Sequence, residues 1–183
     1  ERFDKQIHAP HPQHRGDGTP ASSHDTDTLR VAFVCGSDRK FITDIEREIS
    51  KRHEVRTAYF DDSIDLQKIQ RVMDWADVTW FEWCDQILVH ASQKLRKTSV
   101  VVCRLHRFEA FSKMPEQVNW AFVDTLIPTT NHIIGVLQDR VPDISKLTNI
   151  EVISSTVDLN RFAFEDRKPG FNLAYVGYLH HRK

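Results

Sequence analysis

Long apolar runs are missing from this sequence of 183 residues. No stretch approaches the roughly 18 consecutive apolar residues that a membrane-spanning helix requires, so no such helix is expected. A surplus of one charge is also missing, because 25 Lys and Arg are balanced by 26 Asp and Glu. The sequence therefore provides no overall field that would attract nucleic acid, and no nucleic-acid partner is expected.

Cysteine is scarce and widely spaced, with only Cys35, Cys84 and Cys103. No Cys-x-x-Cys pair occurs, which excludes a zinc ribbon and a thioredoxin-like motif. Three separated cysteines favour a reduced, cytoplasmic setting, in which we expect buried and unreactive thiols.

Glycine-rich nucleotide-binding motifs are absent as well. Only Gly36 lies between Gly18 and Gly135, so neither the three-glycine dinucleotide fingerprint nor a P-loop is present. A G-x-S-x-G turn is also lacking, which excludes the commonest hydrolases of α/β topology. The acidic pair of a receiver domain would follow the first strand, but Cys35 and Gly36 occupy that place.

The first 28 residues contain three of the seven prolines, two of the six glycines and four of the ten histidines, and their apolar residues follow no helical or strand spacing. Such a segment cannot bury enough surface to offset the entropy lost on ordering, so residues 1–28 are predicted to be a flexible linker. Four histidines lie in it, but nothing fixes their spacing, and no metal site is predicted.

From Leu29 onward the sequence alternates between short apolar runs and amphipathic stretches. The apolar runs predict strands over 30–35, 54–60, 77–81, 99–105, 132–137 and 150–154. Helical spacing of apolar residues predicts helices over 41–49, 66–76, 87–95 and, after Pro115, 118–126. Strands that alternate with helices build parallel sheets. The predicted fold class is therefore α/β, with a doubly wound parallel sheet covered by helices on both faces.

The carboxyl ends of the predicted strands are the expected place for a ligand. Gly36 and Ser37 follow the first strand, where a glycine permits close approach to the backbone, although a plain turn is the alternative role. The third strand is followed by Glu82, Cys84 and Asp85, which are expected at the same edge. The neighbouring Trp80 and Trp83 are interpreted as packing residues rather than as a platform on which a sugar stacks.

Charged residues are concentrated directly after the fourth predicted strand, where Arg104 and Arg107 flank His106 and Glu109 follows. Arginine can bind a phosphate or a sugar through two donors, and histidine adds a donor whose protonation is easily tuned. This loop is the predicted ligand-binding segment, and a solvated surface loop is the alternative.

Two segments near the C-terminus have a recognisable pattern. Residues 153–162 read ISSTVDLNRF, and residues 172–179 read NLAYVGYL with Lys183 four positions later. They resemble the P-N-G-V-D-x-x-x-F and G-R-L-x-x-x-K-G segments that link the two Rossmann-like domains of family 4 glycosyltransferases, enzymes of the GT-B fold. The matching residues are Val157, Asp158, Phe162, Gly177, Leu179 and Lys183.

The sequence also departs from the family pattern. Ser154, Ser155 and Thr156 replace the Pro, Asn and Gly of the first segment, and Tyr178 replaces the family's phosphate-binding arginine. The resemblance covers roughly residues 29–183. It implies an acceptor-side Rossmann-like domain over 29–165 and the start of a truncated donor-binding domain over 166–183.

The resemblance also implies roles for residues singled out above. His106 resembles the histidine that these enzymes place near the transferred sugar, and it is the implied catalytic residue. Gly36 resembles the first-strand glycine near the donor diphosphate, which Lys183 would also contact. With most of the donor domain missing, residues 1–183 alone are expected to be inactive.

The function implied by the resemblance is transfer of a sugar from a nucleotide-sugar donor to a glycan, lipid-linked or other acceptor, with retention of configuration and no metal or further cofactor. A basic cluster of Lys94, Arg96 and Lys97 leaves peripheral contact with a membrane open, although a solvated helix end is the alternative. The alternative functions are a GT-B-like nucleotide-sugar epimerase and a non-catalytic Rossmann-like binding module.

Overall fold

The computed structural model describes residues 28–166, 168–171 and 173–175. Nearly all of the predicted linker and the predicted donor-domain residue Lys183 lie outside the described residues. The chain divides into two units, Glu1–Ile153 and Ser154–Lys183. The predicted domain limit at residue 165 stays a prediction.

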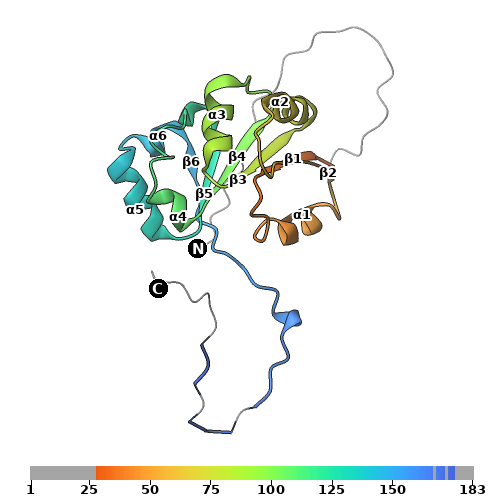
Figure 1. The fold of residues 1–183 in the computed structure, drawn as a ribbon, viewed down its shortest axis with the longest axis vertical. Helices are drawn as coiled ribbons and strands as arrows, with labels where there is room; N and C mark the ends of the chain where they lie inside the picture. The colour runs from red at the N-terminus through yellow and green to blue at the C-terminus, as the bar shows by residue number, and fades with distance from the viewer. Residues whose placement is uncertain (1–27, 167, 172, 176–183) are drawn as a thin grey trace, which may run out of the picture. The chain divides into compact units, whose positions relative to one another are not determined.

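A six-stranded sheet forms the centre of the first unit, and each neighbouring pair of its strands is parallel (Figure 1). The strands are β1 (Arg30–Cys35), β2 (Glu54–Tyr59), β3 (Val78–Glu82), β4 (Val100–Leu105), β5 (Thr125–Pro128) and β6 (Asn149–Ile150). Their order in space is β2-β1-β3-β4-β5-β6. The predicted α/β class with a parallel sheet is confirmed, and the first four strands begin and end within one residue of their predicted limits.

Helices connect the strands of this unit. They are α1 (Thr43–Ile49), α2 (Leu66–Trp75), α3 (Gln86–Lys94), α4 (Arg107–Ala110), α5 (Asn131–Arg140) and α6 (Ile144–Leu147). The predicted helices over 41–49, 66–76 and 87–95 are therefore confirmed as α1, α2 and α3. No helix among residues 28–166 has the length and apolar character that crossing a bilayer demands.

Both faces of the sheet are covered by apolar side chains. On β1, Val31 and Phe33 pack with Ile42 beside α1, whereas Val34 belongs to the larger core on the opposite face. That larger core contains buried residues of α2, α3 and α5, among them Met73, Leu88, Ile133 and Leu137. Burial on both faces explains why the strand sequences are continuously apolar instead of alternating.

The sequence prediction is wrong between residues 118 and 137. The predicted helix over 118–126 is instead a short 3-10 turn, Trp120–Phe122, followed by β5. The buried Trp120 indole donates to the Pro115 carbonyl at 2.8 Å, and this contact stabilises a compact loop. The predicted strand over 132–137 is helix α5, in which Ile133 and Leu137 are four residues apart and both buried.

Strand β6 is shorter than predicted, because it covers Asn149–Ile150 instead of 150–154. In the second unit, the described residues form one 3-10 turn, Leu159–Arg161, where Asp158 accepts a hydrogen bond from the Asn160 amide at 3.0 Å. The family-matched residues Val157 and Phe162 are exposed.

Candidate functional site

The strand order reverses between β1 and β3. The chain passes from β1 outward to β2, and then returns across β1 to β3 and on to β6. In doubly wound sheets, the crevice outside the carboxyl ends of the strands at such a reversal is where ligands bind. The segments that begin at Gly36 after β1 and at Trp83 after β3 form the two sides of this position.

A pocket of about 280 Å³ lies at this position. Its lining residues are Gly36, Ser37, Asp38, Trp83, Asp85, Phe108 and Glu109. The structure thus brings three of the predicted site residues, Gly36, Ser37 and Glu109, into one pocket. Arg107 instead lies beside a neighbouring depression with Phe108, Phe111 and Ser112.

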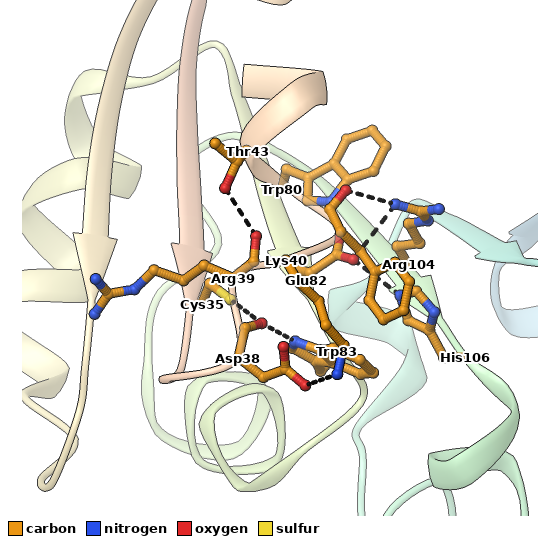
Figure 2. A network of polar contacts seen from close by, with 11 residues as sticks. Cys35, Asp38, Arg39, Lys40, Thr43, Trp80, Glu82, Trp83, Arg104 and His106 are labelled. Atoms are coloured by element: carbon orange, nitrogen blue, oxygen red, sulfur yellow. Dashed lines mark hydrogen bonds and ion pairs between the residues drawn. The ribbon is translucent and has the colours of Figure 1, made fainter. Parts of the chain in front are cut away.

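Glu82, the last residue of β3, is at the centre of a buried polar network (Figure 2). Trp80 Nε1 donates to Glu82 Oε2 at 2.9 Å, and Arg104 donates to Oε1 at 3.4 Å. His106 Nε2 lies 2.9 Å from the same Oε1. A carboxylate only accepts hydrogen bonds, so His106 carries its proton on Nε2 in this contact. The network ties the end of β3 to the end of β4, and it holds Arg104 behind the pocket instead of in it.

The His106 ring is held between two aromatic side chains. Its centroid is 4.2 Å from the Trp83 ring and 4.8 Å from the Phe41 ring, with interplanar angles of 32° and 34°. Such contacts stabilise by roughly 0.5–1.5 kcal/mol each. Arg104 also donates to the Phe41 carbonyl at 3.3 Å. The segment after β1 is therefore fixed to the segment after β4.

Trp83 has a backbone φ of 83°, a left-handed conformation that is unusual for a bulky residue. Its amide donates to the Arg104 carbonyl at 3.1 Å, and its indole donates to the Asp38 carbonyl at 2.9 Å. The turn places the indole where it both stacks on His106 and lines the pocket. Trp80 and Trp83 both pack against the core cluster beside α1, as the packing interpretation predicts, and the Trp80 and Phe33 ring centroids are 6.1 Å apart.

Gly36 is not required by the turn in which it lies. None of the described glycines has a positive φ. A Cβ added at Gly36 would be 3.7 Å from Ile87 Cδ1 and 3.8 Å from Asp85 Oδ2, which is ordinary contact. Neither the turn nor the packing around it therefore requires glycine at this position.

Two carboxyl groups that are shielded from solvent line the pocket, the partly buried Asp85 and the buried Glu109. Asp85 caps α3 and accepts from the amides of Ile87 at 2.8 Å and Leu88 at 3.4 Å. Burial raises the pKa of Asp85 to about 6 despite these bonds. Burial also raises the pKa of Glu109, whose two carboxylate oxygens have no hydrogen-bond partner. Both groups are therefore ready to accept hydrogen bonds from a ligand.

We expect the Asp85→Asn variant to be more stable than the original protein at about pH 7.5, by up to about 3 kcal/mol. The folded protein binds the Asp85 proton more tightly than the unfolded chain does, because its pKa rises from 3.8 to about 6. The contribution of this group to stability therefore falls as the pH rises through that interval. Asparagine keeps a capping oxygen but never carries the buried charge.

Urea unfolding at about pH 4 and about pH 7.5 measures this effect, with the two proteins expected to differ little at the lower pH. Asp65→Asn is the matched control, since Asp65 caps the start of α2 at an exposed position. An identical pH dependence of the Asp85→Asn variant and the original protein would contradict the assignment.

The cysteines are buried and free, as predicted. Burial raises the pKa of Cys35 to about 12, and it raises that of Cys103 well above the ordinary value for a thiol. Thiolate chemistry at neutral pH is therefore disfavoured. Within the described ranges, no group of three or more His, Cys, Asp or Glu residues is arranged to hold a metal ion.

The basic cluster at the end of α3 is partly neutralised. Lys97 pairs with Asp124 at 2.7 Å, and Arg96 lies 3.8 Å from Asp74. Since each of these cations has a nearby carboxylate, the attraction of the cluster for an anionic membrane surface is reduced.

Sequence reasoning placed Asp85 at this edge of the sheet, but it missed Asp38, Phe41 and Phe108. The position of Asp85 just before a helical pattern is a recognisable capping signal. Asp38 and Phe41 had only their closeness to Gly36 as a signal. The exposure of Phe108 in a charged loop gave no indication that it lines a pocket.

No protein-family model matches the chain, and no curated protein is detectably similar to it in sequence.

Proposed function

We propose that residues 29–165 form the acceptor-side domain of a retaining glycosyltransferase of the GT-B type, which transfers a sugar from a nucleotide-sugar donor. One observation carries the proposal. A pocket at the strand reversal joins the segments after β1, β3 and β4, and His106 is stacked directly behind its Trp83 wall. His106 follows the fourth strand, as the family resemblance implies, whereas Gly36 lines the pocket proposed for the acceptor instead of a diphosphate site.

In this proposal, the pocket holds the sugar acceptor. Trp83 and Phe108 offer aromatic faces to a sugar ring, and the carboxyl groups of Asp85 and Glu109 accept hydrogen bonds from its hydroxyls. His106 does not line the pocket, but it is fixed by Glu82 and two rings, so it holds the Trp83 wall in one orientation before substrate binds. The donor diphosphate would be bound by a second domain, together with Lys183.

We place the enzyme in the cytoplasm because its three cysteines are free thiols. No metal or further cofactor is part of the proposed reaction. Arg107 and Phe108 lie on the outer side of the pocket, where they would contact the part of an acceptor that extends beyond its first ring.

The test uses the chain together with any residues that its gene encodes beyond 183. The protein is incubated with a panel of nucleotide sugars, with and without glycan and lipid-linked acceptors, and the products are analysed. Acceptor-dependent transfer of the labelled sugar is the expected result. The 183-residue chain alone is expected to show none, because the donor diphosphate would lack its binding domain.

Two other outcomes would overturn the proposal. Conversion of the nucleotide sugar without an acceptor would identify an epimerase. Absence of any turnover by the longer protein, with the pocket folded as described here, would favour a non-catalytic binding module.

A further inference from the structure

The pocket beside Gly36 is acidic. Three of its seven lining residues are the carboxylic acids Asp38, Asp85 and Glu109, and none of the seven is basic. Glu82, the residue before Trp83, adds a further carboxyl group near the pocket. Burial is the main cause that raises the pKa of Glu109, and the negative charges of Asp85 and Glu82 raise it further. Asp38 is paired with Lys40 Nζ at 2.8 Å, so the acidity of the lining rests on Asp85 and Glu109, and it favours a cationic over an anionic ligand.

The Glu109 carboxylate lacks a hydrogen-bond partner among the residues that the structure describes. The residue is 4% exposed, yet neither carboxylate oxygen accepts a hydrogen bond. A buried polar group left without a partner destabilises the folded state, and it does so more strongly when it is charged. Native structures rarely keep such a group unless something else satisfies it. Since Glu109 lines the pocket, a bound ligand is the natural source of the missing donor.

Aromatic side chains line the same pocket as these acids. Trp83 lines the pocket from the end of β3, and Phe108 lines it from α4 with 83% of its surface exposed. An ammonium group is attracted both to carboxylates and to the faces of aromatic rings. The pocket volume of about 280 Å³ is at the small end of ligand sites, so one ring fits better than an oligosaccharide.

We propose that the pocket binds an amino sugar, with the protonated amine placed against Glu109 and Asp85 and the sugar ring against Trp83 and Phe108. The choice of a sugar rests on the proposed function, because it makes this ligand the acceptor or its terminal residue. The preference for a positively charged amine rests only on the pocket. In a transfer reaction, the diphosphate would therefore lie outside this pocket.

The experiment measures binding to the 183-residue chain, without any donor, by NMR titration at about pH 7. The probes are D-glucosamine and D-glucose, which have the same ring and differ at one substituent. We expect glucosamine to bind at least about tenfold more tightly than glucose. Equal affinity of the two sugars, or no binding of either at millimolar concentrations, would overturn the proposal.

Glu109→Gln is the decisive variant, because it removes a buried charge and keeps nearly the same shape. We expect it to lose most of the preference for glucosamine while its affinity for glucose stays the same. Asp62→Asn is the matched control, since Asp62 is an exposed acid outside the pocket. Full preference for glucosamine in the Glu109→Gln variant would contradict the placement of the amine.

A second variant keeps the test independent of Glu109. Asp38→Asn changes another pocket acid, which is half exposed and lies 2.8 Å from Lys40 Nζ. Its affinity for glucosamine is expected to fall by a few-fold. If the protein binds glucosamine but the longer protein transfers no sugar, the proposed function is wrong and the amine site stands. If the longer protein transfers sugar but the pocket shows no preference for an amine, the amine site is wrong and the proposed function stands.

Discussion

Replacing Glu82 by alanine is expected to destabilise the folded chain by about 3–5 kcal/mol. The Glu82 side chain has no exposed surface, and it accepts hydrogen bonds from Trp80, Arg104 and His106. Removal of the carboxylate leaves a guanidinium that is only 7% exposed without its acidic neighbour. Since a domain is stable by about 5–15 kcal/mol in total, this single change would remove a large share.

Urea denaturation followed by circular dichroism measures the loss, and Glu116→Ala is the matched control. Glu116 also pairs with an arginine, Arg140, and at 2.6 Å the contact is shorter than the 3.4 Å of the Glu82 pair. Because the Glu116 pair is partly solvated, its removal is expected to cost less than about 1 kcal/mol. Equal losses of stability in the two variants would show that burial does not determine how much the Glu82 network contributes to the free energy of unfolding.

Replacing His106 by glutamine is expected to lower kcat/KM for sugar transfer by about 100-fold in the longer protein. Glutamine can still donate to Glu82, but it offers neither the imidazole nor the flat ring that stacks between Trp83 and Phe41. The folded state is expected to remain, with a loss of stability of less than about 2 kcal/mol.

The measurement compares turnover with a saturating nucleotide-sugar donor and a range of acceptor concentrations. His132→Gln is the control, because His132 also lies beside an aromatic ring, Phe111, but outside the pocket. Unchanged turnover of the His106→Gln variant would remove His106 from any catalytic role. A loss confined to stability would assign it a purely structural one.

The predictable parts of the fold are those determined by local sequence. The run that ends in Cys35 has a strand composition and stops at Gly36, so β1 was predicted over its full observed length. The prediction for residues 118–137 was wrong because local sequence does not determine the structure there. Its apolar residues fit both periods, and only tertiary contacts such as the indole of Trp120 against Pro115 distinguish a loop and strand from a helix.

The candidate site was predictable in position but not in its contacts. The rule for the carboxyl ends of parallel strands placed Gly36, Glu82 and Glu109 near one another. It did not indicate that Glu82 faces inward to hold Arg104 and His106, because these partners are 22 and 24 residues away in the chain. The left-handed backbone of Trp83 likewise has no signal in the residue type, since tryptophan rarely adopts it.

The hydrogen bond from Arg104 to the Phe41 carbonyl limits how the pocket can change by substitution during evolution. One wall of the pocket is anchored to the same buried charges that stabilise the sheet, so substitutions on that side alter ligand binding and folding together. Phe108, in contrast, is largely exposed, and Ser37 is exposed as well. New ligand preferences would therefore arise most easily from this outer rim, while the inner wall stays constant.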